Sequence, residues 1–350
     1  MTFEQQEAEF VAEGPRSPRP VQAAAVGRIV PGLLRLIEVY GVLLLAILLV
    51  VFYSWLLPRT FPTALTAQSI LSDKSTVALL SLAEVIVIAA GQFDLSIGYV
   101  VGIGHILAVG LQVRSGLSWE VAAIIVLFVG AAIGLTNALL VQVAQIDSFI
   151  ATLGTGTVVY GISIWYTGGQ QIVGPLPAEF LAINGAKLFG IPLPAFYVLA
   201  VTIMVWLAFE YFPVGRYLYA IGANRRAAEL VGIPIDRYVT AAFVASGMIA
   251  AFAGLVLGSR LQVGQSNIGP EYLLPAFVGA LLGATTIKPG RVNAWGTLIA
   301  VLVLAIGISG IQQMGASFFV EPLFNGLMLI VAVGLAGYAA RRRLRTRIRE

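Results

Sequence analysis

The sequence of 350 residues contains no cysteine, one histidine and few charged side chains. Without cysteine, a disulfide framework, a thiolate nucleophile and a cysteine metal site are excluded, and one histidine leaves little material for a metal cluster. No segment reads G-x-x-x-x-G-K followed by Ser or Thr, so the chain does not bind ATP through a Walker loop of its own. Charged residues make up 11% of the chain, against about 25% in soluble domains, and 59% of its residues are hydrophobic. This composition predicts a membrane protein.

The two ends of the chain are polar, and both are predicted to be cytoplasmic. The first 27 residues mix acidic and basic side chains and do not resemble the basic region and short apolar run of a signal peptide. We therefore expect a disordered cytoplasmic tail over residues 1–35, a single transmembrane domain over 36–340 and a basic cytoplasmic tail over 341–350. The net charge of +4 is assigned to membrane topology, with no nucleic-acid partner.

Long apolar segments recur along the whole domain. A helix needs roughly 20 mostly apolar residues to cross the hydrocarbon core, because each residue rises about 1.5 Å. Ten segments meet or approach this length, with the second and the eighth short, and they predict an all-α polytopic membrane protein with short or broken helices. The predicted spans are residues 37–57, 74–90, 95–112, 121–143, 149–167, 192–212, 239–259, 272–287, 295–314 and 322–340.

The basic residues give an independent test of this arrangement, because cytoplasmic loops carry the excess of Lys and Arg. If both termini are cytoplasmic, most of the 21 basic residues fall on the cytoplasmic side. The basic residues left outside are Arg59, Lys74, Arg114, Lys187 and Arg260. An even number of spans therefore fits the charge distribution, and the C-terminal run ARRRLRTRIRE is interpreted as an orientation anchor in preference to a lipid-binding site.

The segment GQFDLSIG, residues 91–98, places Asp94 between the second and third spans. One interpretation is a helix N-cap, because aspartate accepts the free N–H groups of a first turn. The other is a solute contact, because broken helices in transporters place helix ends near the solute. Gly98 and Gly102 would let another helix approach closely, and His105 is expected to be a packed, hydrogen-bonded residue.

Two further polar side chains lie inside predicted spans. Glu84 is near the middle of the second span, where an ionisable group costs on the order of 3 kcal/mol to insert and marks a functional-site candidate. The competing interpretation is a neutral carboxylic acid hydrogen-bonded to a neighbouring helix. Asn137, beside the close-approach pair Gly130 and Gly134, is predicted to hydrogen-bond between helices.

Two other functional classes remain open at this stage. A proton-coupled carrier would use Glu84 and His105 as a relay. A membrane hydrolase would use Ser309, in the segment GISG, with His105 as its base. Chance explains the GISG match better in a chain so rich in glycine and serine, and aspartyl proteolysis lacks a convincing carboxylate pair around Asp94. We therefore expect no enzyme.

The densest charge in a cytoplasmic loop lies within residues 213–238. Asn224 is a good N-cap, RRAAELV favours a helix, and Gly232 followed by Ile233 and Pro234 is a stop signal. A short helix here, without an apolar stripe long enough for a core, is predicted to dock another protein; a plain connector is the alternative.

The segment GRYLYAIGANRRAAELVGI resembles the cytoplasmic coupling segment of one family of membrane subunits. These are the permeases of ATP-binding-cassette importers of the ribose, xylose and autoinducer-2 type, the branched-chain amino acid and ribose permease family. Further segments are similar to the family in the same order, over roughly residues 70–335. They are GQFDLSIG, GLTNALLV (134–141), FIATLGT (149–155), TGGQ (167–170), SGMIAAFAGLVLGSRLQVGQSNIG and TTIKPGRVNAWGT.

The chain departs from the family pattern at a few positions, which puts the identity of the solute in doubt. Gln92 and Phe93 replace two glycines, Glu84 stands where an uncharged residue is expected, and Ala284, Pro289 and Val292 replace further glycines.

The resemblance implies a bacterial inner-membrane permease subunit that works as a homodimer or as a heterodimer with a paralogue. A separate cytoplasmic ATPase would bind the ATP, so no cofactor is expected here, and a periplasmic solute-binding protein would deliver the solute near residues 168–191. The favoured solute is a simple sugar or polyol, with a nucleoside or branched-chain amino acid as the alternative. The residues expected along the solute path are Glu84, Asp94, Ser96, Asn137 and Thr152. Those expected to couple to the ATPase are Gly222, Asn224, Arg225, Arg226, Ala227, Ala228, Glu229 and Gly232.

Overall fold

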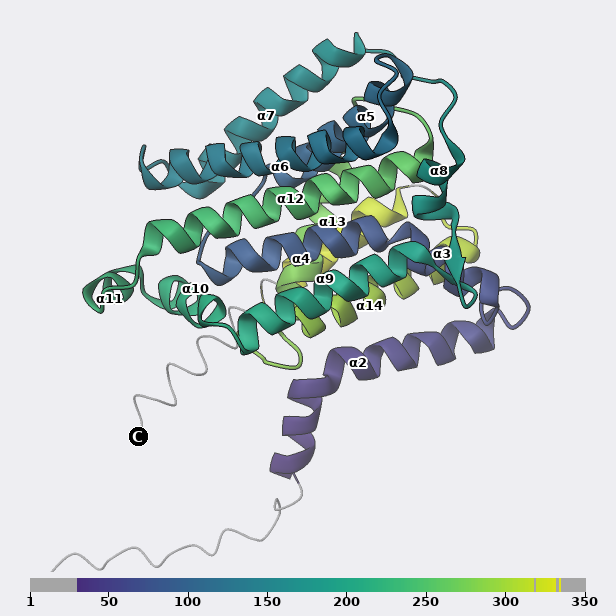
Figure 1. Ribbon diagram of the computed structural model, residues 1–350. Coiled ribbons are helices and arrows are strands. Elements are labelled where there is room, and N and C mark those ends of the chain that lie inside the picture. The colour runs from purple at the N-terminus through teal and green to yellow at the C-terminus, as the bar shows by residue number, and fades with distance from the viewer. Residues whose placement is uncertain (1–29, 318, 332–333, 335–350) are drawn as a thin grey trace, which may run out of the picture. The chain divides into compact units, whose positions relative to one another are not determined.

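The computed structural model describes residues 30–317, 319–331 and 334 of the chain (Figure 1). It divides into two compact units, residues 1–36 and residues 37–350. The predicted tail 341–350, and the part of the N-terminal tail before Val30, lie outside the described residues.

Helices account for nearly all the regular structure of the described residues. In chain order they are α2 (Val30–Leu56), α3 (Ala64–Asp73), α4 (Ser75–Ala89), α5 (Ile97–Val113), α6 (Trp119–Gln142), α7 (Ser148–Thr167), α8 (Ala178–Gly185), α9 (Leu193–Glu210), α10 (Pro213–Ala223), α11 (Arg225–Leu230), α12 (Ile235–Leu261), α13 (Pro270–Gly283) and α14 (Ala294–Gln313). The strands β1 (Lys187–Leu188) and β2 (Ile191–Pro192) pair antiparallel between α8 and α9.

Six of these helices are long and apolar enough to cross a membrane: α2, α6, α7, α9, α12 and α14. Four shorter apolar helices accompany them: α4, α5, α13 and Val320–Val331. Each of these helices overlaps a predicted span, and the last predicted span, 322–340, continues beyond the described residues. The short lengths predicted for the second and eighth spans are confirmed by α4 and α13. The chain is therefore a multi-pass all-α membrane protein.

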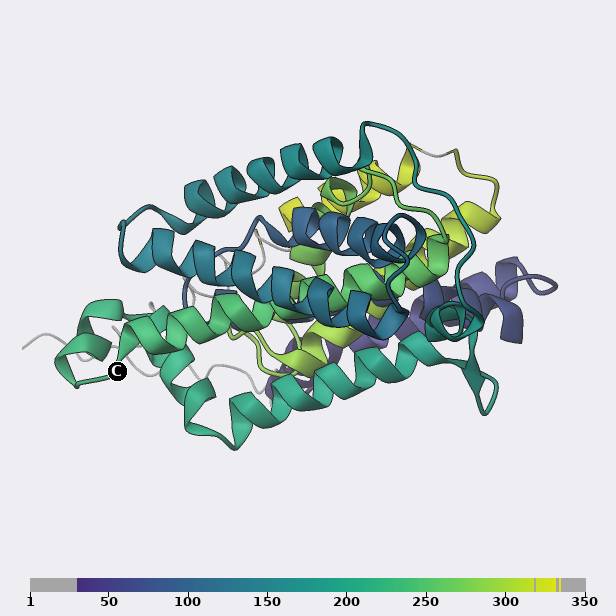
Figure 2. The ribbon, with the colours of Figure 1, turned by 45° about the horizontal axis from the view of Figure 1, so that its top comes forward.

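Helix α12 lies at the centre of the larger unit, between α5 and α6 on one side and α4 on the other (Figures 1 and 2). Small residues make this packing possible. A Cβ added to Gly134 would lie 2.3 Å from the carbonyl oxygen of Phe243, and one added to Gly130 would lie 2.4 Å from that of Gly247. The close approach predicted for these two glycines is confirmed, with α12 as the partner.

The close approach predicted for Gly98 and Gly102 has a different partner. A Cβ on Gly102 would lie 2.7 Å from the carbonyl oxygen of Ile268, and one on Gly98 would lie 3.0 Å from that of Gly269. Both partners belong to the non-helical segment that enters α13. Gly98 and Gly102 therefore admit an irregular backbone segment, whereas Gly104 of the same helix lies against α12.

The helices α3 and α8 and the β1–β2 hairpin were not predicted. They lie toward the end of α12 that is opposite to α11 (Figure 1). Helix α8 is fixed by the fully buried ring of Phe180, whose carbonyl oxygen accepts a 2.7 Å hydrogen bond from the hydroxyl of Ser259 on α12.

Candidate functional site

The segment Phe93–Ser96 leads from α4 into α5 without forming a helix of its own, and its residues other than the exposed Phe93 are buried in the helix packing. Inside a membrane each free N–H group must find a partner in the protein, because no water is available. Four successive backbone N–H groups of this segment, which we call the polar break, each donate to a side chain. The pairs are Phe93 to Ser148 Oγ (3.2 Å), Asp94 to Glu84 Oε1 (3.2 Å), Leu95 to Thr152 Oγ1 (2.9 Å) and Ser96 to Asp94 Oδ1 (3.1 Å).

Asp94 is the centre of the polar break. Its fully buried carboxylate accepts hydrogen bonds from the hydroxyl of Ser96 at 2.5 Å, the amide of Asn137 on α6 at 3.4 Å and the hydroxyl of Ser246 on α12 at 3.0 Å. Both carboxylate oxygens are thus occupied by donors from three elements. Hydrogen bonds of this number and kind are what a buried carboxylate needs, so Asp94 holds the start of α5 against α6 and α12.

The prediction that Asp94 is the N-cap of α5 was wrong in position. The N-cap residue is Ser96, and its side chain makes no capping bond, because its hydroxyl donates to Asp94. Asp94 instead accepts the N–H group two residues ahead, as in an Asx turn. Asp94 therefore fixes the backbone turn that precedes the first residue of α5.

Glu84 lies on α4 and is fully buried. Its Oε1 accepts the N–H of Asp94, whereas its Oε2 has no hydrogen-bond partner among the described residues. The structure therefore brings two carboxyl groups together across the polar break, a pairing that the sequence did not suggest.

All five residues expected along the solute path gather at the polar break. Ser96 and Asn137 share a 2.8 Å hydrogen bond, and Thr152 also donates to the carbonyl oxygen of Ser148 at 2.7 Å. Ser148 and Ser246 belong to the same network but were missed. Ser148 could have been found from its spacing, because it lies one helical turn before Thr152 and so shares its face.

His105 lies elsewhere, as a packed residue. Its ring nitrogens contact the carbonyl oxygens of Gly102 (3.1 Å) and Val263 (3.0 Å), and its Nε2 also contacts the N–H of Gln265 (3.2 Å). Among the described contacts, neither Glu84 nor Ser309 is a partner of His105. The hydroxyl oxygen of Ser309 accepts a hydrogen bond from the side chain of Gln313 at 3.5 Å.

The short helix predicted within residues 213–238 is confirmed as α11. The side chain of Asn224 caps it by accepting the N–H of Ala227 at 3.0 Å, and Gly232 ends it with a φ of +79°. Two apolar side chains at its C-terminal end project from the protein surface: Leu230 is 74% exposed and Val231 is 76% exposed. Ala228, by contrast, is buried.

The end of α10, directly before α11, packs against the end of α4 and the turn that leads into the polar break. A Cβ on Gly222, near the end of α10, would lie 2.4 Å from the carbonyl oxygen of Ala89, and one on Gly91 would lie 3.0 Å from Cα of Gly222. Arg225 also donates to the side chain of Gln142, at the end of α6, at 2.6 Å. Contacts from α10 and α11 therefore reach the end of α4, the turn after it and the end of α6.

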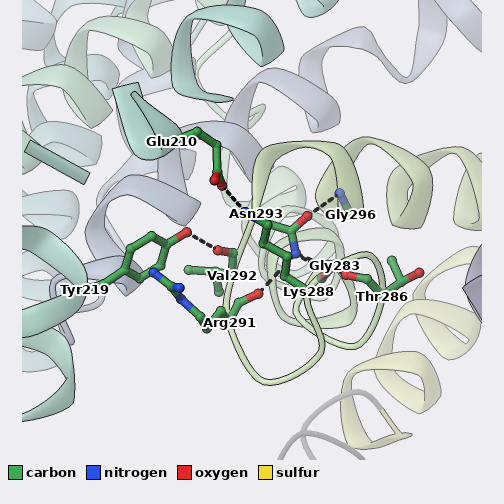
Figure 3. Close-up of polar contacts among 9 residues, drawn as sticks. All are labelled: Glu210, Tyr219, Gly283, Thr286, Lys288, Arg291, Val292, Asn293 and Gly296. Atoms are coloured by element: carbon green, nitrogen blue, oxygen red, sulfur yellow. Dashed lines mark hydrogen bonds and ion pairs between the residues drawn. The ribbon is translucent and has the colours of Figure 1, made fainter. Parts of the chain in front are cut away.

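A second set of contacts joins α9 and α10 to the loop between α13 and α14, residues 284–293 (Figure 3). The hydroxyl of Tyr219 donates to the carbonyl oxygen of Val292 at 2.6 Å, and the guanidinium of Arg291 lies 3.8 Å from the centre of the Tyr219 ring. Lys288 forms an ion pair with Glu210 at the end of α9. Burial raises the pKa of Tyr219 to about 12, so its hydroxyl remains a donor at neutral pH.

Asn293 holds this loop in shape from within. Its amide nitrogen donates to the carbonyl oxygens of Gly283, Thr286 and Arg291 at 3.1–3.2 Å, and its Oδ1 accepts the N–H of Gly296 at 2.8 Å (Figure 3). One side chain therefore both closes the loop and caps α14.

Known proteins resemble this chain over most of its length. The ribose import permease protein RbsC of Bacillus subtilis (strain 168) is 32% identical over 287 residues, which cover 82% of this chain and 88% of that protein. The autoinducer 2 import system permease protein LsrD of Escherichia coli (strain SMS-3-5 / SECEC) is 30% identical over 267 residues, covering 75% of this chain and 81% of that protein. No solved structure matches the chain.

The family model described as "branched-chain amino acid transport system / permease component" matches residues 66–333. This range agrees with the extent over which the sequence motifs resembled that family. Members of the family are transport components and not catalysts. The chain therefore belongs to this family and is a permease subunit of an ATP-binding-cassette importer.

Proposed function

We propose that this permease imports a simple sugar or polyol across the bacterial inner membrane, energised by a separate ATPase subunit. The observation that carries the coupling is α11, a short capped helix whose exposed end presents Leu230 and Val231 and has no partner in the described part of the chain. The printed names of the relatives support the solute class, since they are ribose and autoinducer 2 import permeases. Nucleoside or branched-chain amino acid import is the alternative.

The complete proposal includes ten membrane spans with both termini in the cytoplasm, in a single domain over residues 36–340. The four shorter apolar helices complete this count. Two copies, or one copy and a paralogue, would form the pore, with the ATPase below and a periplasmic binding protein above. In this orientation α11 is cytoplasmic and the β1–β2 hairpin faces the periplasm.

The coupling mechanism follows from the two contacts of α10. When the ATPase subunits close on their nucleotide, a force on α11 reaches the polar break through Gly222 and Gly91, and it reaches α13 through Tyr219 and Val292. The polar break lies between the short helices α4 and α5, and α13 is itself short. Short or interrupted helices are the parts of transporters that rearrange around a solute.

The residues of the polar break are proposed to meet the solute only after this rearrangement. In the present conformation Asp94, Ser96, Asn137 and Thr152 are buried and bonded to one another or to the backbone. Solute hydroxyl groups would take over some of these bonds when α4 and α5 separate. Such replaceable contacts suit a path that must also release the solute.

The test is purification of the chain in mild detergent from its native membrane, with identification of the co-purifying proteins by mass spectrometry. An associated ATPase subunit is the expected result, and uptake by a strain lacking the gene then identifies the solute. If the chain supports uptake but is always recovered alone, a proton-coupled carrier that uses Glu84 replaces the proposal.

A further inference from the structure

A cavity of about 610 Å³ opens at the end of α12 that is opposite to α11. It lies where the α3–α4 junction, the end of α12, the start of α13 and the end of α14 come together, with Glu321 and Asn325 closing one side. We call it the α13 cavity. Its volume is in the range of sites for small molecules, roughly 300–1,000 Å³. In the proposed orientation it faces the periplasm.

The α13 cavity is lined by five charged side chains, and both of its bases are already paired. Lys74 contacts Glu321 at 2.6 Å, and Arg260 contacts Asp73 at 2.8 Å. The remaining carboxylate, Glu271, has no ion pair among the described residues, so the lining carries an excess of negative charge. Such a cavity repels an anion, because neither base is free to neutralise it.

One buried polar atom in the lining lacks a partner. Asn325 is only 4% exposed, and no described residue donates to its Oδ1. An acceptor left in this state costs about 1–3 kcal/mol, and an O–H or N–H group entering the cavity would satisfy it. Beside it, Gln312 donates to the second oxygen of Glu321 at 3.1 Å, which leaves a rim of amide and carboxylate groups in fixed positions.

The other walls are less polar. The ring of Tyr272 and the side chains of Val77 and Leu274 offer apolar surface next to these amides and carboxylates. Carboxylates and amides suit hydroxyl groups, whereas an aromatic ring and aliphatic carbons suit the C–H face of a sugar ring.

We infer that the α13 cavity binds the transported solute, a neutral polyhydroxylated molecule of monosaccharide size, on its way from the binding protein to the polar break. This inference rests on the proposed function. Helix α13 begins in the cavity and ends at the loop that Tyr219 and Asn293 hold. Solute in the cavity and the ATPase at α11 therefore act on the two ends of one short helix.

The absence of cysteine makes a direct test possible, because a single introduced thiol is the only one in the chain. The variant Leu274→Cys places a thiol in the cavity wall, and Phe189→Cys places a matched thiol in the β1–β2 hairpin, outside the cavity. The full-length variants are reconstituted in lipid nanodiscs and labelled with a maleimide. D-Ribose, D-xylose, ribitol and D-ribose 5-phosphate are the probes.

A bound solute is expected to slow labelling of Leu274→Cys by the factor 1 + [L]/Kd, about tenfold at ten times Kd. Labelling of Phe189→Cys is expected to stay constant, and D-ribose 5-phosphate is expected not to protect. Adding Asn325→Leu or Glu271→Gln to Leu274→Cys should remove the protection. Asn325→Leu removes the amide group, whereas Glu271→Gln removes only a negative charge. If Asn325→Leu fails to fold, Glu271→Gln still tests whether the cavity lining binds the solute.

The outcomes separate this inference from the proposed function. If cells import one of the neutral probes through this chain and that probe does not protect Leu274→Cys, the inference is wrong and the importer proposal stands. If a binding protein without solute protects the thiol and the solute alone does not, the cavity is a protein-docking surface and the inference is again wrong. If no sugar or polyol is imported through the chain, the proposed function itself fails.

Discussion

The hydroxyl of Tyr219 donates a 2.6 Å hydrogen bond to the backbone carbonyl of Val292, and this bond fastens the helix leading into α11 to the loop between α13 and α14. Arg291 lies over the same ring at 3.8 Å, so the loop holds both the edge and the face of Tyr219. The contact joins segments separated by 73 residues in the chain. Through this contact α10, which leads into the proposed ATPase contact α11, is joined to the loop at the end of α13.

Tyr219→Phe removes the hydroxyl and keeps the ring under Arg291. A hydrogen bond of this kind contributes about 0.5–1.5 kcal/mol, so we expect little change in folding but a several-fold fall in solute transported per ATP hydrolysed. The measurement is uptake and ATPase activity of the reconstituted importer in the same preparation. Tyr217→Phe, on the same helix, is the control, and an equal effect of both variants would contradict the assignment.

The same bond is expected to be insensitive to pH across the physiological range. The ordinary pKa of tyrosine is about 10, and burial raises that of Tyr219 to about 12. A raised pKa means that the protonated, hydrogen-bonded form is favoured in the folded protein, so its contribution is complete below about pH 10 and is lost as the pH rises through 12. The difference in thermal stability between the native chain and Tyr219→Phe should therefore stay constant from about pH 6 to 9. A difference that shrinks within this window would disprove the buried position of the hydroxyl.

Leu230→Glu and Val231→Glu test α11 as the contact with the ATPase. Both side chains are exposed, so a charge there leaves the permease folded but disrupts an apolar contact with a partner. A few residues of an interface, buried at its centre, each contribute about 2 kcal/mol or more. If Leu230 and Val231 are such residues, we expect about tenfold or greater loss of co-purified ATPase. Phe189→Glu, in the exposed β1–β2 hairpin, should have no effect. Ala228→Glu is unsuitable, because Ala228 is buried and its variant would unfold the helix itself.

Much of the fold follows from patterns within short stretches of the sequence. Apolar length predicted all ten apolar helices, and the capping of α11 followed from Asn224 and Gly232, because length and caps are local properties. The β1–β2 hairpin and α8 were not predicted, because local patterns do not determine them. Their position depends on Phe180 reaching the core and on Ser259, which lies 79 residues further along the chain.

The polar residues of the site were found, but their relationship was not. An ionisable residue in an apolar segment is conspicuous in a sequence, which is why Glu84 and Asp94 were identified. Their pairing depends on how the chain turns between α4 and α5. The donor Ser246 and the acceptor Ser148 each look ordinary in a serine-containing helix. The cavity at α13 depends on five separate segments and left no local signal.

Glu84→Gln distinguishes an ATP-driven importer from a proton-coupled carrier. The glutamine oxygen can still accept the N–H of Asp94, so the polar break should survive. We expect uptake to fall by less than about twofold, because the loss of one protonatable group does not affect an ATP-driven cycle, whereas a carrier using this group loses general acid–base capacity worth about 10²-fold or more. Uptake of labelled solute by whole cells is the measurement, and complete loss at normal expression would favour the carrier. Glu84→Leu, which removes the acceptor, is the contrasting variant and should lower thermal stability.

Gly134→Ala tests the packing of α6 against α12, on which the position of Asn137 and Ser246 beside Asp94 depends. The added methyl would lie 2.3 Å from the carbonyl oxygen of Phe243, so the two helices must separate. Overpacking of this kind costs about 1–3 kcal/mol. We expect a lower melting temperature in detergent, followed by tryptophan fluorescence, together with reduced uptake. Gly161→Ala on α7 is the matched control, because nothing lies within 4 Å of its added methyl. Alanine is the better helix former by about 1 kcal/mol, so this variant should melt at the same temperature or higher, and equal destabilisation by both substitutions would show that the α6–α12 contact is not as close as described.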